Sequence, residues 1–152
     1  MLVFGGGENK QGFVYALDLT DMNWNRIKNV QYNREAHSAN LIGDSIYLFG
    51  GYVRRTNDIH KYDIKQKTFQ KVDTTGNIPS KRYGHGSAVI EEKLYIFGGD
   101  VWTDPDTTLY SLNTNSNEWE TISIASDFLP PPLEYPSMFS LKNNLYLFGG
   151  YN

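Results

Sequence analysis

The segment Tyr47-Leu48-Phe49-Gly50-Gly51 is one of four copies of a hydrophobic tag that ends in two glycines. The other copies are Leu2-Val3-Phe4-Gly5-Gly6, Tyr95-Ile96-Phe97-Gly98-Gly99 and Tyr146-Leu147-Phe148-Gly149-Gly150. The tag phenylalanines are 45, 48 and 51 residues apart along the chain. A repeat of this length is too long for a helical hairpin and fits a unit of four short strands.

Two further positions recur in register with the tags. An Asp or Asn follows each of the first three glycine pairs, and a large aromatic residue follows six positions later. The Asp or Asn residues are Asp18, Asp63 and Asn113, and the aromatic residues are Trp24, Phe69 and Trp119. Independent features that keep the same order in three repeats indicate one recurring structural unit.

Alternating polar and apolar residues predict four strands in each repeat. The first strand is expected at 36–42 and again at 84–90, and the second contains the tag. The third is an alternating segment such as 59–62, and the fourth carries the aromatic residue, as in 118–122. Because no segment shows the 3.6-residue apolar period of a helix, the chain is predicted to be all-β.

The glycine pairs and the aromatic positions have a structural interpretation. Glycine permits positive φ and close backbone approach, which an inner strand needs where wedge-shaped sheets crowd around an axis. An aromatic side chain on the fourth strand can pack between neighbouring sheets, because it buries a large area. The expected structural positions are Gly5, Gly6, Gly50, Gly51, Gly98, Gly99, Gly149, Gly150, Trp24, Phe69, Trp119, Asp18 and Asp63.

Together, the tags, the Asp positions and the Trp positions resemble kelch repeats, which form β-propellers. The resemblance covers essentially the whole chain, although Leu133 and Pro136 replace the Arg and His of the preceding repeats. It implies a propeller segment of four-stranded antiparallel blades, with strands a to d running outward from the axis. We expect 1–30 to supply strands b, c and d, 31–78 and 79–126 to form full blades, and 127–152 to supply strands a and b of a further blade.

Three repeat lengths are fewer than the roughly four to eight blades of a closed propeller. An open ring leaves its end blades with uncovered faces and unpaired edges, which favour aggregation. We therefore expect the chain to be part of a larger propeller in a multidomain protein. The alternative is a homodimer in which two copies complete a six-bladed ring.

The composition excludes several classes of protein. The chain is 39% hydrophobic and 14% aromatic with a net charge of −3, which argues against disorder and against a nucleic-acid partner. No cysteine is present, so disulfides, thiolate metal sites and cysteine nucleophiles are excluded. No apolar run approaches the ~18 residues of a membrane span, so we expect no membrane partner. Since no Asn-x-Ser/Thr sequence occurs, we expect a cytoplasmic protein, with the nucleus as the alternative.

The sequence lacks the familiar motifs of catalysis and metal binding. There is no Gly-x-Ser-x-Gly, no P-loop, no His-x3-His and no cluster of carboxylates. We expect no catalytic residue, metal or cofactor; the alternatives are a kelch-fold enzyme acting on a sugar or small metabolite, and an actin or cytoskeletal scaffold. His37 and His85 hold equivalent positions and are interpreted as structural, whereas His60 is expected to face sideways or be exposed.

Arg34 and Arg82 each lie 15 residues before the next tag phenylalanine, where the chain enters an inner strand. The resemblance implies that arginines at this entry line the mouth of the central cavity, where they suit acidic peptide side chains. The alternative is a surface or inter-blade salt bridge.

The loops between the second and third strands are expected to open on the same face as these arginines. The candidate partner-binding residues are Arg34, Arg82, Tyr83, Tyr52, Arg54, Arg55 and Trp102. The sequence therefore predicts a protein–protein interaction module that recognises a partner peptide or protein through loops on one face.

Overall fold

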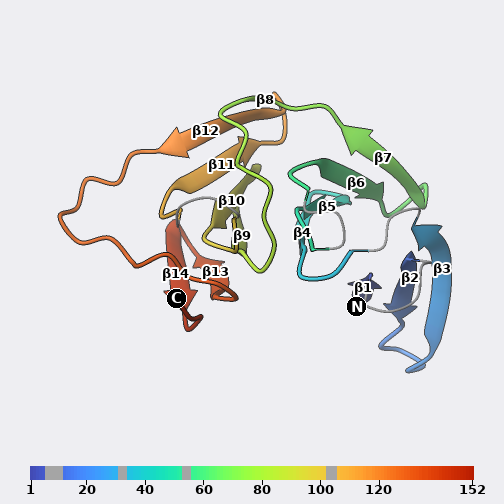
Figure 1. The fold of residues 1–152 in the computed structure, drawn as a ribbon. Helices are drawn as coiled ribbons and strands as arrows, with labels where there is room; N and C mark the ends of the chain where they lie inside the picture. The colour runs from blue at the N-terminus through green and yellow to red at the C-terminus, as the bar shows by residue number, and fades with distance from the viewer. Residues whose placement is uncertain (6–11, 31–33, 53–55, 102–105) are drawn as a thin grey trace.

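A computed structural model of the chain describes residues 1–5, 12–30, 34–52, 56–101 and 106–152. These ranges contain strands and turns and no helix, which confirms the all-β prediction. Accordingly, the described residues include no helix long and apolar enough to cross a membrane. The strands form four separate sheets (Figure 1).

Strands that follow one another in the chain are neighbours in each sheet, except that the first strand of the third sheet lies beside its last strand. The first contains β1 (Leu2–Phe4), β2 (Gly12–Leu17) and β3 (Trp24–Val30), and the second contains β4 (Ser38–Ile42), β5 (Ser45–Phe49), β6 (Ile59–Asp63) and β7 (Thr68–Val72). The third contains β8 (Thr75–Gly76), β9 (Gly86–Ile90), β10 (Lys93–Phe97), β11 (Leu109–Asn113) and β12 (Glu118–Ile122), and the fourth contains β13 (Ser137–Leu141) and β14 (Asn144–Phe148). Neighbouring strands are antiparallel except β8, which pairs in parallel with β12.

The four sheets stand side by side along an arc, with β3, β7 and β12 on its outer side (Figure 1). The strands β4, β9 and β13 lie next to one another on the inner side. Side chains link them, since the Asn40 amide donates to Ser87 Oγ over 3.0 Å and Ser140 Oγ donates to the Val89 carbonyl over 2.6 Å. This arrangement is that of consecutive propeller blades.

Aromatic side chains fill the space between neighbouring sheets. Trp119 on β12 is buried, and its ring lies 5.2 Å from that of Phe49 in the preceding sheet. Phe69 on β7 occupies the same place one sheet earlier, with its ring 6.1 Å from that of Phe4. Trp24 on β3 differs from both, because it is 52% exposed. No sheet of the described chain covers the face on which it lies.

The first glycine of a tag passes directly against the next sheet. Gly98 has φ +67°, and a Cβ placed on it would lie 2.3 Å from the carbonyl oxygen of Leu133. Gly50 has φ +66° and approaches the carbonyl of Arg82 in the same way. A side chain at either position would collide with backbone, so the sheets reach this spacing because the residue is glycine.

The recurring Asp or Asn position shapes the turn between the third and fourth strands. Asp18 accepts a hydrogen bond from the backbone N–H of Thr20, and Asp63 accepts one from that of Gln66. Asn113 accepts one from the N–H of Asn115 at 2.9 Å. A side-chain oxygen is all that this turn requires, which explains why Asn replaces Asp in the third repeat.

Candidate functional site

Three equivalent segments precede the inner strands and lie in a row along the hollow side of the arc. They are Arg34-Glu35-Ala36, Arg82-Tyr83-Gly84 and Leu133-Glu134-Tyr135. The N–H of Gly84 donates to the Ala36 carbonyl over 2.8 Å, and that of Tyr135 donates to the Gly84 carbonyl over 2.6 Å. Backbone hydrogen bonds therefore join the three segments from one sheet to the next.

The residue that follows each glycine pair lies beside the middle residue of these segments. The N–H of Tyr52 donates to the Glu35 carbonyl, that of Asp100 to the Tyr83 carbonyl, and that of Tyr151 to the Glu134 carbonyl, each over 2.9 Å. Each of three neighbouring sheets thus presents one tyrosine and one carboxylate at the same place. With Tyr135 these residues form a group that we call the tyrosine–carboxylate row: Glu35, Tyr52, Tyr83, Asp100, Glu134, Tyr135 and Tyr151.

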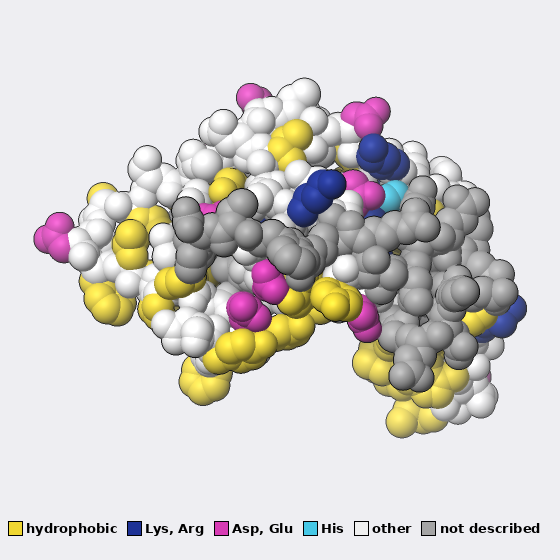
Figure 2. Space-filling view, viewed as in Figure 1, with side chains coloured by type: hydrophobic (Ala, Val, Ile, Leu, Met, Phe, Trp, Pro, Cys, Tyr) yellow, Lys and Arg dark blue, Asp and Glu magenta, His cyan; other side chains and the backbone are white. Residues whose placement is uncertain are grey.

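The tyrosine rings contact one another along the row. The ring centroids are 4.9 Å apart for Tyr52 and Tyr83, 6.3 Å for Tyr83 and Tyr135, and 5.9 Å for Tyr135 and Tyr151. The Tyr83 hydroxyl donates a hydrogen bond to the Asp100 carboxylate. In Figure 2 hydrophobic side chains line the concave edge of the molecule, with acidic side chains beside them.

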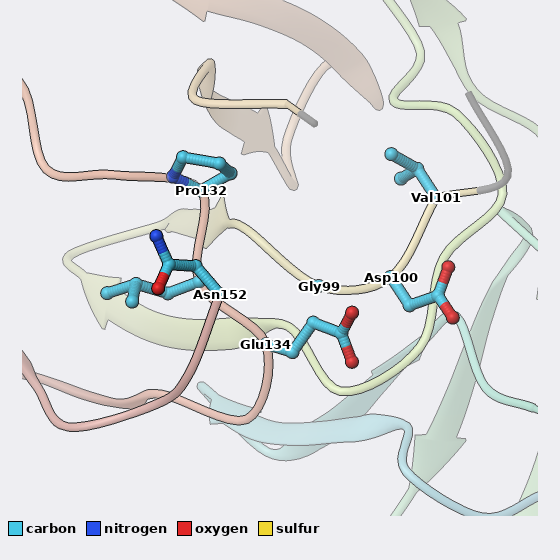
Figure 3. A pocket seen from close by; sticks show the side chains of 7 residues that line it. Gly99, Asp100, Val101, Pro132, Glu134 and Asn152 are labelled. Atoms are coloured by element: carbon cyan, nitrogen blue, oxygen red, sulfur yellow. The ribbon is translucent and has the colours of Figure 1, made fainter. Parts of the chain in front are cut away.

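An open pocket of about 470 Å³ lies within the row, lined by Glu35, Ala36, Tyr52, Tyr83 and Tyr135. A second pocket of about 140 Å³ lies at the other end, between Pro132 and Val101. Figure 3 shows the carboxylates of Asp100 and Glu134, which both line this second pocket. The two concavities place acidic groups from three sheets along one surface.

The electrostatic environment of the row is negative. Partial desolvation raises the pKa of Tyr135, and the charges of Glu134, Asp100 and Glu35 raise it further. Desolvation also raises the pKa of Tyr151, together with a hydrogen bond to Glu134. A phenol loses its proton less readily where carboxylates already surround it.

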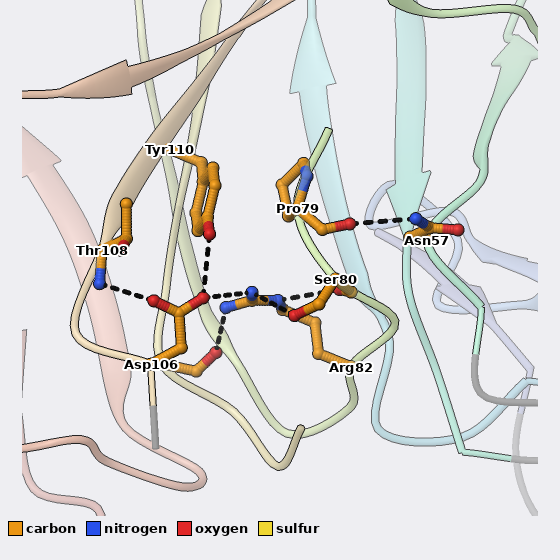
Figure 4. A network of polar contacts seen from close by, with 8 residues as sticks. Asn57, Pro79, Ser80, Arg82, Asp106, Thr108 and Tyr110 are labelled. Carbon is orange, nitrogen blue, oxygen red and sulfur yellow. Dashed lines mark hydrogen bonds and ion pairs between the residues drawn. The ribbon is translucent and has the colours of Figure 1, made fainter. Parts of the chain in front are cut away.

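Arg82 points away from this surface and into the protein (Figure 4). Its side chain is fully buried, and Nη1 donates to the Gly98 carbonyl over 2.9 Å. Its Nη2 donates to Asp106 over 2.6 Å and to the Ser80 hydroxyl over 2.9 Å. The guanidinium therefore links the segment before β9 to the third tag and to the segment before β11.

Arg34 makes the same contacts one sheet earlier. Its Nη1 donates to the Gly50 carbonyl over 3.0 Å, and its Nη2 donates to Asp58 over 2.7 Å. In both sheets the carbonyl lies 16 residues after the arginine and the Asp 24 residues after it. The two arginines are therefore equivalent braces within their sheets.

The carboxylate partners of these arginines are ionised. Burial raises the pKa of Asp106, but hydrogen bonds from Arg82 and Thr108 outweigh this effect and leave the pKa below its ordinary value. The Tyr110 hydroxyl also donates to Asp106, over 2.9 Å. The charge of each arginine is thus matched inside the sheet rather than presented to solvent.

The histidines are also enclosed. His85 Nε2 lies 2.9 Å from Ser38 Oγ, and burial lowers the pKa of His85 to about 3. Burial and the charge of Arg34 lower the pKa of His37 to about 4. His60 was expected to face sideways or be exposed, and the second alternative is wrong: its side chain is buried, with Nδ1 2.6 Å from Arg34. No group of three or more His, Asp or Glu in the described ranges could hold a metal ion.

The structure brings together only some of the residues singled out from the sequence. Tyr52 and Tyr83 lie in the tyrosine–carboxylate row, whereas Arg34 and Arg82 lie beneath it. Arg54, Arg55 and Trp102 lie outside the described residues. Sequence reasoning missed Glu35, Asp100, Glu134, Tyr135 and Tyr151. Their signal was positional, because they follow the entry residue or the glycine pair of a repeat.

Comparison with known proteins matches residues 1–150 to the KLHDC2/KLHL20/DRC7 Kelch-repeats domain. The chain is 32% identical over 87 residues to Kelch domain-containing protein 3 of Bos taurus, and 33% identical over 87 residues to the proteins of that name from Mus musculus and Homo sapiens. Each match covers 51% of this chain and 23% of the relative. The chain thus spans less than a quarter of the length of these relatives. Because the family match extends over almost all of the chain and the sheets are arranged as blades, the chain belongs to the kelch-repeat family, as the tags indicated.

Proposed function

We propose that the chain is a protein–protein interaction module that captures a partner peptide or protein on the face formed by the tyrosine–carboxylate row. Kelch-repeat domains are generally protein-interaction modules. The observation that carries the proposal is the recurrence of one tyrosine and one carboxylate at the same place in three neighbouring sheets.

The composition of this surface suits a protein interface. Tyrosine is enriched at interfaces, where it supplies a large contact area and loses few rotamers on binding. Tyr52, Tyr135 and Tyr151 are between 49% and 59% exposed, so their rings are accessible. The backbone hydrogen bonds between sheets fix the positions of these side chains before a partner arrives, which reduces the entropic cost of binding.

The buried arginines support the same surface from beneath. Arg34 and Arg82 each hold a tag glycine carbonyl against the entry of an inner strand, next to Glu35 and Tyr83. We infer that they position the surface, and that the row makes the contacts with the partner. We place this activity in a larger multidomain protein in the cytoplasm, with the nucleus as the alternative.

A binding comparison tests the proposal. The chain is immobilised and probed with an array of short peptides of varied sequence, alongside the double variant Tyr52→Ser/Tyr135→Ser. We expect the double variant to lose the peptides that the unaltered chain retains, because both rings line the open pocket. Leu19→Ser is the matched control, since Leu19 is exposed in the turn between β2 and β3, at the end of these strands that faces away from the tags.

Two outcomes contradict the proposal. One is retention of the same peptides by the double variant and the unaltered chain. The other is cosedimentation with actin filaments, or turnover of a sugar, by a chain that retains no peptide. The first would move binding to another surface, and the second would favour a scaffold or an enzyme.

The end sheets allow the alternative to a larger propeller, a homodimer, to be tested. Phe148 in the last tag is 77% exposed, whereas its equivalents Phe49 and Phe97 are buried. Trp24 is 52% exposed, whereas its equivalent Trp119 is buried against Phe49. Phe148 and Trp24 are thus equivalent to the two residues, Phe49 and Trp119, that pack against each other within the chain. In the homodimer, which is the alternative to a larger propeller, these two faces of neighbouring copies would meet.

Light scattering after gel filtration tests this assembly. A dimer for the chain and a monomer for Phe148→Ser would support the homodimer, because a polar side chain removes one half of the aromatic contact. Phe128→Ser is the control, since Phe128 is also 77% exposed but lies in a connection rather than in a tag. A monomeric unaltered chain would contradict the dimer and leave peptide capture unaffected.

A further inference from the structure

We propose that the tyrosine–carboxylate row recognises a cationic side chain, so that the partner segment carries an arginine or lysine at the position that enters the open pocket. This inference rests on the proposed function and names the chemistry of the partner. It reverses the sign expected from the sequence, where the arginines suggested acidic peptides.

The acidic groups come from three sheets and converge on one surface. Glu35 lines the open pocket, and Asp100 and Glu134 line the neighbouring one. Among the described residues, neither Glu35 nor Glu134 forms an ion pair with Lys or Arg. The negative charge of these two groups is therefore available to a ligand.

The nearest arginines in the described chain do not neutralise this surface. Arg34 precedes Glu35 and Arg82 precedes Tyr83, but both guanidiniums turn inward. Arg34 pairs with Asp58 and Arg82 pairs with Asp106, so each positive charge is already matched. The inward arginines and the outward carboxylates leave the described part of the surface net negative.

The tyrosines add a second attraction for a cation. An ammonium or guanidinium within about 6 Å of an aromatic ring centroid is attracted by the ring quadrupole. Tyr52 and Tyr83 meet edge to face at 75°, so rings of two orientations border the same pocket. A pocket of about 470 Å³ accommodates a lysine or arginine side chain with room for its neighbours.

The combination selects against other side chains. An acidic side chain of the partner would be repelled by the like charge of Glu35. If it were buried in the pocket, neither its own carboxylate nor that of Glu35 would have a cation beside it. A neutral side chain would gain contact with the rings but none of the charge attraction. Arginine fits best, because its planar group can stack on tyrosine while its N–H groups donate to a carboxylate.

Fluorescence anisotropy with three labelled peptides tests this inference. The peptides are identical except that the central residues are arginine, glutamine or glutamate. We expect the arginine peptide to bind most tightly and to weaken as the salt concentration rises, because exposed charges are screened. We expect Glu35→Gln/Glu134→Gln to weaken the arginine peptide about tenfold or more, equivalent to about 1.4 kcal/mol, and to leave the glutamine peptide unchanged.

Glu91→Gln/Glu92→Gln is the matched control for net charge. Both glutamates are exposed in the turn between β9 and β10, at the opposite end of these strands from Tyr83. We expect this variant to bind the arginine peptide like the unaltered chain. A urea unfolding curve for each variant checks that the fold is retained. We expect it to be retained, because all four substitutions are isosteric and lie on the surface.

The outcomes separate this inference from the proposed function. Preferential binding of the glutamate peptide, or unchanged arginine selectivity in Glu35→Gln/Glu134→Gln, overturns the inference but keeps the interaction module. Failure of every peptide in this assay and in the array overturns both. Spermidine that competes as tightly as the arginine peptide would show a site for small polyamines and overturn peptide recognition.

Discussion

Arg82 and Asp106 form an enclosed ion pair, with Nη2 2.6 Å from Oδ2 and no part of the arginine side chain exposed. The same pair recurs one sheet earlier between Arg34 and Asp58, with the same spacing of 24 residues. A buried charge that loses its partner keeps its desolvation cost and loses the compensating attraction. The pair is therefore more important for stability than an ion pair on the surface.

We expect Arg82→Met to lower the free energy of unfolding by about 3–5 kcal/mol, because it leaves the largely enclosed Asp106 carboxylate without its ion-pair partner. Urea unfolding measures this change. Lys65→Met is the control, since Lys65 pairs with Asp44 while both side chains are more than two-thirds exposed. We expect it to cost less than about 1 kcal/mol. A double variant Arg82→Met/Asp106→Asn should cost less than the sum of its single changes, and strict additivity would contradict the coupling.

Two glycines with the same backbone angle should respond differently to alanine. Gly98 and Gly149 both have φ +67°, but a Cβ on Gly98 would lie 2.3 Å from the Leu133 carbonyl, and one on Gly149 meets nothing within 4 Å. We expect Gly149→Ala to lose about 1–2 kcal/mol from the backbone angle alone. Gly98→Ala should lose a further 1–3 kcal/mol or so from overpacking. Equal urea midpoints for Gly98→Ala and Gly149→Ala would contradict this, because they would mean that the third and fourth sheets can move apart without a loss of stability.

The aromatic residues on the outer strands offer a second matched pair. Trp119 is buried against Phe49, and Trp24 is 52% exposed at the equivalent position. We expect Trp119→Ala to cost about 3–5 kcal/mol, as truncation of a buried aromatic residue usually does. Trp24→Ala should cost far less in the monomer. Thermal unfolding at low protein concentration checks this order, and a similar loss for both would mean that Trp24 is covered in solution.

Stability should fall as the pH drops below the ordinary histidine range. Burial lowers the pKa of His85 from 6.5 to about 3, so below pH 6.5 the unfolded chain takes up a proton that the folded chain does not. The stabilisation is complete above pH 6.5 and is lost progressively as the pH falls toward 3. His37, with a pKa of about 4, acts in the same direction.

Urea midpoints at pH 7 and pH 5 test this pH dependence, because the lowered pKa of Asp106 keeps that carboxylate ionised across the interval. We expect His85→Gln to lose less stability than the unaltered chain between these two values, since glutamine does not titrate there. Parallel losses in both proteins would show that His85 is accessible to protons in the folded state.

Much of the fold followed from the tags alone. Their spacing defined the repeat, and the alternation around them predicted strands that the structure contains, such as β6 and β12. The turn at Asn113 could also be predicted, because the position recurs as Asp in the other repeats. These features depend on local sequence and on the distance between repeats, and both can be counted along the chain.

The direction of a side chain was harder to predict. The position of Arg82 at the entry of an inner strand was correct, but its partner Asp106 lies 24 residues further on, and only the folded sheet brings them together. The exposed position considered for His60 is wrong for a related reason. Alternation along β6 assigns one side of the strand to solvent, whereas Arg34 from the segment before β4 covers that side.

The short strand β8 gives the chain an unusual pattern of cooperativity. The chain leaves the second sheet at β7 and enters β8. There the N–H of Thr75 donates to the carbonyl of Asn117 and the N–H of Asn77 donates to that of Trp119, and both carbonyls lie on or beside β12, the outer strand of the third sheet. The segment that connects two sheets is thereby held by the later one. When the third sheet opens, β8 and the end of the second sheet that leads into it must also be released. The smallest unit that exchanges its amide hydrogens together therefore spans parts of two repeats.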